Sequence, residues 1–234
     1  MARYLPEAGS ARLAELFEVD EDEAHPDRQG LMKRVAGAAA LVADPTVAVD
    51  AGLLDAAGPD LRVVANFAVG YDNIDVEACR ARGVIVTNTP DVLTNATAEL
   101  AVALMLAAAR RLGEGERLVR AGRWRGWEPG QLLGRELAGA TVGIVGLGRI
   151  GTRVAELLRG FDVDLLYAAR SRRPEAEDRL GAHHSPLDQL LELERVILAP
   201  HIGSATAQAR DGMARLVAEN VIAVLEGHEP LTPV

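Results

Sequence analysis

A glycine-rich turn between a strand and a helix is the feature that most constrains the fold of this chain. The β-rich run Thr141–Val145 leads directly into Gly146-Leu147-Gly148-Arg149-Ile150-Gly151, and helical sequence continues over Thr152–Arg159. In such a turn the first glycine permits a tight bend, the second lets the backbone approach a diphosphate, and the third lets helix and strand pack closely. The helix N-terminus adds amide donors and the positive end of its dipole. The motif predicts a dinucleotide-binding α/β unit, and the alternative is a glycine-rich turn without a ligand.

The next strand, predicted over Val163–Tyr167, ends without the carboxylate that would bind the ribose hydroxyls of NAD(H). Four residues that can donate hydrogen bonds to a phosphate follow it instead: Arg170, Ser171, Arg172 and Arg173. Guanidinium groups bind phosphate in a forked geometry. This loop therefore favours NADP(H) over NAD(H), with NAD(H) still possible, and the alternative is a solvated basic loop.

The N-terminal part alternates between strand and helix patterns. Short apolar or β-rich runs cover Ala39–Val42, Leu61–Phe67 and Gly83–Thr87, and helical segments at Leu53–Ala57 and Ile74–Arg82 lie between them. This rhythm predicts a parallel sheet covered by helices.

The longest helix signal runs from Thr94 to Arg111 and is apolar on nearly every face. We expect such a helix to be buried all round, either in the centre of the fold or at a subunit interface, and we predict a homodimer. The segment Gly122–Leu133 carries Trp124 and Trp127 and reads as an irregular loop pinned by these aromatic residues, which could instead line the substrate site of a partner subunit.

Composition narrows the classes of partner. The net charge of −9 disfavours nucleic acid, which needs a basic face, and it disfavours anionic membranes. The longest apolar run, Leu100–Ala109, is half of a membrane span, and the first residues lack the apolar core of a signal peptide. A lone Cys79 cannot form an internal disulfide. We expect a cytoplasmic protein that binds small molecules.

Five stretches of the sequence match one known family: Asn66–Asp75, Thr87–Glu99, Gly122–Trp124, Val145–Gly151 and Pro200–Thr206. With them the chain resembles the D-isomer-specific 2-hydroxyacid dehydrogenases, most closely the glyoxylate/hydroxypyruvate reductase branch. The resemblance implies an oxidoreductase that transfers a hydride between NADP(H) and a small 2-keto or 2-hydroxy acid. It also implies an α/β fold with a flavodoxin-like substrate domain, residues 1–90 and 207–234, and a Rossmann-type cofactor domain, residues 91–206.

The resemblance also assigns roles to individual residues. His201 would protonate the developing alkoxide, and the backbone amides of Val69 and Gly70 would hold the substrate carboxylate. No metal is implied, and His183-His184 reads as a surface pair. The motif and the resemblance together give the predicted cofactor-binding residues as Thr97, Gly146, Gly148, Arg149, Ile150, Gly151, Arg170, Ser171, Arg172 and Gly203.

Two residues that the family uses have no counterpart in its expected motifs. These are an arginine that polarises the keto acid and a glutamate paired with the histidine. Where they should lie, Leu187–Leu191 runs almost directly into Leu193–Pro200, as if several strands and helices were deleted near Leu191–Leu193. A full dinucleotide fold needs two strand–helix–strand halves, and only 88 residues follow Gly146. We therefore expect an incomplete second half, and a catalytically impaired dinucleotide-binding relative is the alternative function.

Overall fold

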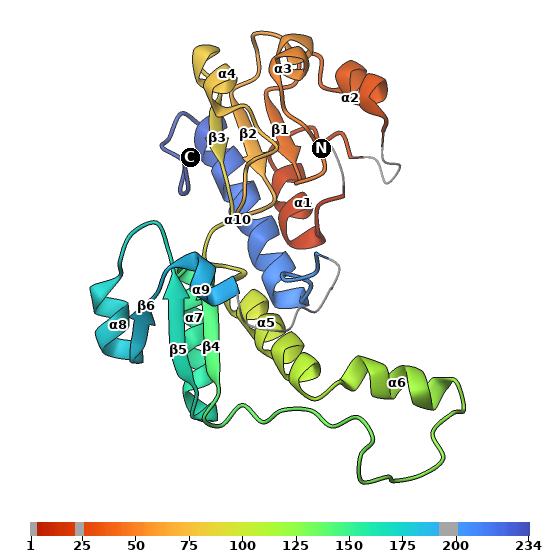
Figure 1. Ribbon diagram of the computed structural model, residues 1–234. Helices are drawn as coiled ribbons and strands as arrows, with labels where there is room; N and C mark the ends of the chain where they lie inside the picture. The colour runs from red at the N-terminus through yellow and green to blue at the C-terminus, as the bar shows by residue number, and fades with distance from the viewer. Residues whose placement is uncertain (1–3, 22–25, 192–200) are drawn as a thin grey trace. The chain divides into compact units, whose positions relative to one another are not determined.

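The computed structural model describes residues 4–21, 26–191 and 201–234. The chain divides into two compact units, here called unit 1 (Met1–Leu93 with Ala205–Val234) and unit 2 (Thr94–Ser204). Each unit contains a three-stranded sheet whose neighbouring strands pair in parallel, with helices packed beside it (Figure 1). The predicted α/β class with parallel sheets is confirmed.

The sheet of unit 1 is built from the predicted apolar runs. Its strands β1 (Ala40–Ala43), β2 (Val63–Asn66) and β3 (Ile85–Thr87) lie in the order β1-β2-β3. Every residue of β2 is buried, as expected for a central strand covered on both faces. The intervening helices are α3 (Ala51–Ala57) and α4 (Val76–Ala81), close to their predicted bounds.

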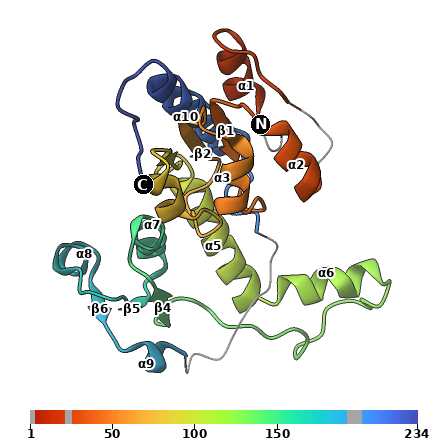
Figure 2. The ribbon, with the colours of Figure 1, turned by 90° about the horizontal axis from the view of Figure 1, so that it is seen from above.

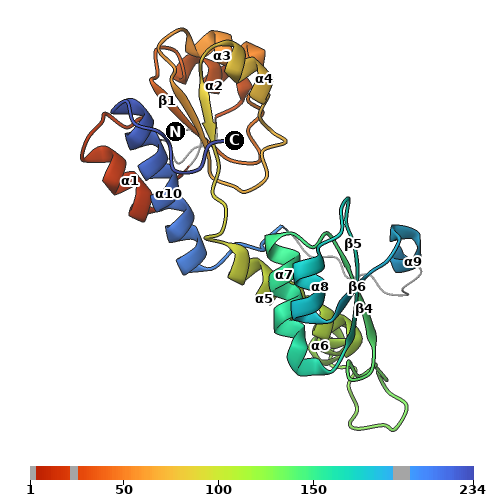
Figure 3. The same cartoon turned by 90° about the vertical axis from the view of Figure 1, so that its left-hand side faces the viewer.

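Helices cover both faces of this sheet (Figure 3). The long helix α10 (Ala207–Leu225) packs along the strands, and α1 (Glu7–Ala14) packs on α10. On the other face α3 contacts α4 and also α2 (Arg28–Arg34).

The sheet of unit 2 has the order β4-β5-β6. Strand β4 (Thr141–Val145) matches its prediction and pairs with β5 (Asp164–Ala168), which pairs with β6 (Ala182–His184). Among the described residues β4 has a strand partner on one side only, and Val145 is 65% exposed. The strand predicted at Val196–Ala199 lies outside the described residues.

Helices lie on the two faces of the unit 2 sheet (Figure 2). Helix α7 (Arg149–Leu158) and α5 (Thr94–Ala109) pack together on one face, and the short 3₁₀ turn η1 (Arg159–Phe161) follows α7. The short α9 (Leu187–Leu191) lies on the opposite face, and α8 (Pro174–Leu180) contacts β6.

Within the single chain, helix α5 is only partly buried, so of the two alternatives for Thr94–Arg111 burial at a subunit interface is the one that stays a prediction. Ala98 is its one fully buried residue, and it joins the unit 2 core with Ala155 and Leu158 of α7. The apolar composition of α5 signals a need for burial, but packing against α7 covers only part of its circumference. Its remaining apolar surface is half-exposed in the single chain.

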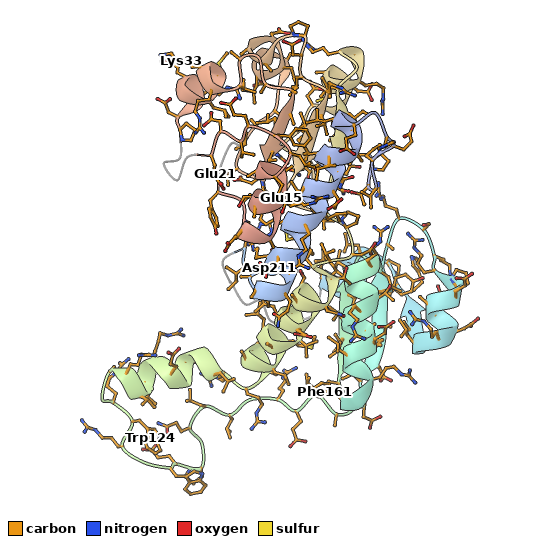
Figure 4. The ribbon with its side chains drawn as sticks, turned by 180° about the vertical axis from the view of Figure 1, so that it is seen from behind. Glu15, Glu21, Lys33, Trp124, Phe161 and Asp211 are labelled. Atoms are coloured by element: carbon orange, nitrogen blue, oxygen red, sulfur yellow. The ribbon has the colours of Figure 1, made fainter. Side chains whose placement is uncertain are left out.

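An arm follows α5 and projects away from the unit 2 sheet. It consists of α6 (Leu112–Arg120) and an irregular stretch up to β4, and no residue of α6 is buried. Trp124 lies in this irregular stretch (Figure 4) and is 54% exposed, whereas Trp127 is 83% exposed. The prediction that these tryptophans pin the loop is wrong within the described chain, because neither is buried by it.

Cys79 on α4 is fully buried in the unit 1 core. Burial raises the pKa of its thiol to about 11, and the charge of Asp75 acts in the same direction. At neutral pH the thiol is therefore protonated and behaves as a small apolar core residue. None of the helices in the described part of the chain has the length and apolarity needed to cross a membrane.

Candidate dinucleotide and carboxylate sites

The turn after β4 has the backbone geometry that the glycine motif predicts. Gly146 has φ +92°, a conformation that residues with a Cβ rarely adopt, and its N–H donates to the carbonyl of Ala168 on β5 at 2.8 Å. A Cβ added to Gly151 would lie 2.0 Å from the carbonyl oxygen of Gly146. The first and last glycines are therefore both required, one for the bend and one for the close approach of α7 to the turn.

The start of α7 is open. Gly148 is its N-cap, no side chain of the described residues caps the helix, and a Cβ added to Gly148 would meet no other part of the described chain within 4 Å. The first hydrogen bond within the helix runs from Thr152 N to Gly148 O at 2.8 Å, so the preceding first-turn amides have no acceptor inside the helix. Amides at the positive end of a helix dipole bind anions. The turn therefore fits the diphosphate of a dinucleotide.

The loop after β5 exposes all four predicted phosphate-binding residues, Arg170, Ser171, Arg172 and Arg173. Arg172, however, forms an ion pair with Glu177 of α8, with Nη2 2.5 Å from Oε2 and Nε 3.2 Å from Oε1. The strand end itself carries no carboxylate, as the sequence shows, but a carboxylate that the sequence pattern alone does not identify lies against the loop. The carboxylate comes from the following helix, ten residues after Tyr167, and not from the strand itself.

Tyr167 forms a second hydrogen bond to this carboxylate. Its side chain is fully buried, its hydroxyl donates to Glu177 Oε1, and the backbone N–H of Arg173 donates to the same hydroxyl at 2.8 Å. Burial raises the pKa of Tyr167, and its bond to Glu177 raises it further. The hydrogen bond from Arg172, followed by that from Tyr167, lowers the pKa of Glu177 to about 2. Glu177 is thus ionised throughout the neutral range.

This pKa predicts how acid affects stability. A carboxylate with a lowered pKa in the folded state contributes stability above its ordinary pKa near 4.5, and loses it as the pH falls toward about 2. We expect Glu177→Gln to lower the free energy of unfolding at pH 7. The difference from the wild type should shrink as the pH falls below about 4.5. Urea unfolding at several pH values measures it, and a difference that does not change with pH would contradict this assignment.

The structure brings two other predicted cofactor residues of unit 2 together. A Cβ added to Gly203 would lie 2.9 Å from Cγ2 of Thr97 on α5, so this glycine lets the chain pass close to the helix. His201, two residues earlier, is exposed. Pro200, the first residue of the histidine motif, lies outside the described residues.

Val69 and Gly70 belong to unit 1, in the turn after β2. The side-chain amide of Asn66 donates to the carbonyl of Gly70 at 2.7 Å, and that of Asn88 donates to the carbonyl of Val69 at 2.9 Å. Asn66 is fully buried, and its side-chain amide also donates to Oδ1 of Asn73 through a longer hydrogen bond of 3.5 Å. The sequence pattern alone does not identify a role for these asparagines. These two bonds hold the carbonyl groups of the turn, and its backbone N–H groups are donors of the kind that a carboxylate accepts from.

Among the described residues no group of three or more histidine, cysteine, aspartate or glutamate side chains could hold a metal ion. His183 and His184 are both exposed on β6, and the ring of His184 packs edge-on against Tyr167 with centroids 5.2 Å apart. The ring contact gives His184 a packing role beside the loop after β5.

Comparison with known proteins identifies the family of the chain. The model for the D-isomer specific 2-hydroxyacid dehydrogenase catalytic domain matches residues 2–234. A glyoxylate reductase of Thermococcus onnurineus is 39% identical over 314 positions, which cover 99% of this chain and 94% of that protein.

Solved structures show the same relationship. A D-isomer specific 2-hydroxyacid dehydrogenase of Polaromonas, described as NAD-binding, has a TM-score of 0.85 at 29% identity and covers 100% of this chain and 98% of that one. An NADPH-dependent glyoxylate/hydroxypyruvate reductase of Sinorhizobium meliloti has a TM-score of 0.76 at 28% identity, covering 99% and 95%. The chain therefore belongs to the D-isomer specific 2-hydroxyacid dehydrogenases, a family of oxidoreductases.

Proposed function

We propose that this chain is a cytoplasmic dinucleotide-binding protein of the 2-keto acid reductase type, with NADP(H) preferred over NAD(H) and glyoxylate or hydroxypyruvate as the class of substrate. The observation that carries the proposal is the turn after β4. There Gly146 has a positive φ, Gly151 closes on its carbonyl, and the N-terminus of α7 has no side-chain cap. Backbone donors at a tight turn and an open helix start are suited to a diphosphate.

The residues that would hold the dinucleotide lie in unit 2. The amides of Gly148, Arg149, Ile150 and Gly151 would bind the diphosphate, and Thr97 and Gly203 would border it. When bound, the nicotinamide supplies the hydride. His201 would donate a proton to the substrate oxygen, and the N–H groups of Val69 and Gly70 would hold the carboxylate.

The preference for NADP(H) depends on the loop after β5. Arg170 and Ser171 are exposed at its start, and Arg172 and Arg173 extend the positive charge. Charge-assisted bonds from guanidinium groups to a phosphate are stronger than neutral ones. The relative from Sinorhizobium meliloti is described as NADPH-dependent, which supports the preference.

Calorimetric titration with NADPH and NADH tests this part of the proposal. We expect NADPH to bind at least about tenfold more tightly, because one bond to a charged group contributes about 1.5–3 kcal/mol. Arg170→Ala should weaken NADPH binding alone. Arg159→Ala, which removes an exposed arginine elsewhere in unit 2, is the matched control and should change neither affinity. Equal affinities, or tighter NADH binding, would refute the preference.

A second candidate function is a catalytically impaired relative that binds the dinucleotide but turns over slowly or not at all. Two observations favour it. The alignment with the Thermococcus relative is longer than the 234 residues of this chain. Among the described residues, β4 has a strand partner on one side only and Val145 is exposed, at the place where a complete Rossmann sheet continues. The proposed gap near Leu191–Leu193 falls at the end of the described segment 26–191.

We also propose a homodimer formed through α5. The half-exposed apolar surface of α5 and the exposed Trp124 and Trp127 on the arm support it, since contiguous apolar patches mark interaction surfaces. We expect sedimentation at micromolar concentration to give the mass of a dimer. Leu106→Glu, which places a charge on α5, should shift the mass to that of a monomer while circular dichroism stays unchanged. A folded wild-type monomer at this concentration would refute the dimer.

A further inference from the structure

The carboxylate of Glu177 occupies an unusual position for a residue beside an arginine-rich phosphate-binding loop. It accepts from the buried hydroxyl of Tyr167 through Oε1, and from Arg172 through both oxygens. Its side chain is only 14% exposed, whereas that of Arg172 is 67% exposed. A fixed negative charge therefore lies under the loop, bonded to one of its three guanidinium groups.

The anchoring of this carboxylate is built into two elements. Tyr167 is in β5, with no exposed surface, and the backbone N–H of Arg173 donates to its hydroxyl at 2.8 Å. Glu177 lies in the first turns of α8, whose start is fixed by Pro174. The loop is thus tied down at positions 172 and 173, whereas Arg170 and Ser171 remain exposed.

The occupied oxygens decide what Glu177 can do. A carboxylate that replaced the missing acidic residue of the strand would have to offer its oxygens to the ribose hydroxyls. Oε1 of Glu177 accepts from both Tyr167 and Arg172, Oε2 accepts from Arg172, and the side chain is only 14% exposed, so we expect the carboxylate to act on the ligand mainly through Arg172 and through its charge. It compensates one positive charge of the loop and holds that guanidinium in place.

We infer that Glu177 is a specificity-determining positioning residue, which sets how strongly this loop distinguishes a ribose 2′-phosphate from a free 2′-hydroxyl. The inference rests on the proposed function. Glu177 reduces the attraction of the loop for the phosphate dianion and leaves the affinity for a dinucleotide without that phosphate unchanged. Because Glu177 is paired with Arg172, part of its negative charge is compensated and its repulsion of the phosphate is reduced.

Two probes that carry only the adenosine half separate this effect from all events at the nicotinamide. Adenosine 2′,5′-bisphosphate has the 2′-phosphate, and adenosine 5′-phosphate lacks it. We expect Glu177→Gln to bind the bisphosphate on the order of tenfold more tightly, from the Coulomb interaction of one unit charge with a dianion in a high-dielectric setting. The affinity for adenosine 5′-phosphate should stay within about twofold.

Arg172→Ala tests whether the charge of Glu177 affects phosphate binding, because it removes the partner of that charge. It leaves the carboxylate of Glu177 uncompensated, so the affinity for the bisphosphate should fall on the order of tenfold, and the double variant with Glu177→Gln should return close to the wild type. Arg172 is exposed, so this variant keeps the fold. Glu175→Gln removes an exposed charge from the same helix and is the matched control, with an expected change of less than about twofold because solvent screens it.

The outcomes are distinct. If Glu177→Gln weakens both probes in parallel, or leaves their ratio unchanged, Glu177 has a structural role only and the inference is wrong. If Arg172→Ala is not rescued by Glu177→Gln, the coupling between them is absent and the inference is again wrong. If the folded wild type binds neither probe nor NADPH, the proposed function itself fails and the inference fails with it.

Discussion

A Gly151→Ala variant should lose most of its affinity for NADPH and NADH alike. The added methyl carbon would lie 2.0 Å from the carbonyl oxygen of Gly146, far inside contact distance, so the turn and the first turn of α7 must move apart. Such overpacking costs about 1–3 kcal/mol, and where it falls on the bound conformation it weakens binding by up to about 100-fold. Calorimetry with both cofactors measures the loss.

Gly160→Ala is the matched control for this variant. Gly160 lies in η1 of the same unit, its φ is not positive, and a Cβ there would have no protein atom within 4 Å. We expect it to bind both cofactors as the wild type does. Wild-type binding by a folded Gly151→Ala protein would show that the turn after β4 does not form the diphosphate site.

The strands and their turns could be predicted because each has a local cause. Strand β4 has the predicted bounds since Thr141–Val145 is a β-rich run that stops at a glycine with positive φ. Helix α3 ends at Ala57, as predicted, because Gly58 follows with φ +84°. Asp75 caps α4 by accepting from the N–H of Ala78 at 2.9 Å, a local contact of the kind that a short polar side chain before a helix predicts.

The errors concern contacts that are not local. The composition of α5 shows that it needs apolar neighbours, but not that α7 covers only one side of it. In the loop after β5, the sequence identifies the arginines but not their partners. Glu177 reaches Arg172, five residues earlier in the chain, and the hydroxyl of Tyr167 because α8 folds back against the loop. The first-turn acidic residues after Pro174 were the available signal for this carboxylate.

The hydrogen bonds from Asn66 and Asn88 to the carbonyl groups of Gly70 and Val69 could not be predicted, for a related reason. Asn66 is at the end of a buried strand, where a polar side chain must find hydrogen-bond partners. The sequence shows this need, but the acceptors lie four residues along the chain for Asn66 and nineteen residues back for Asn88. Three-dimensional structure was required to identify the carbonyl groups of one turn as the shared target.

The second large effect concerns turnover. We expect this chain to reduce glyoxylate or hydroxypyruvate at least about 100-fold more slowly than an ordinary enzyme rate of about 10 per second. We propose that His201 donates the proton and that the stretches in which the family carries its arginine and glutamate have no counterpart between Tyr167 and Pro200. Loss of one such electrostatic partner lowers turnover on the order of 10²–10³-fold.

Incomplete positioning adds to this loss. Among the residues that the structure describes, β4 has no strand partner on its second side and Val145 is exposed, which supports our proposal that the part of the fold supporting the nicotinamide is incomplete. Misplacement of a reacting group by about 1 Å can itself lower the rate by about 100-fold. We therefore expect NADPH to bind to unit 2, while the reduction of the keto acid by the bound NADPH is slow.

Oxidation of NADPH by a folded sample, followed by absorbance with glyoxylate and with hydroxypyruvate, measures the rate. His201→Asn should abolish whatever rate remains, because the imidazole is the proposed proton donor. A rate near 10 per second would contradict the argument from the missing residues. The roles of the absent arginine and glutamate would then have to be filled from elsewhere, with Arg123 and Arg125 on the exposed arm as the first side chains to replace. An active His201→Asn enzyme would remove His201 from the mechanism as well.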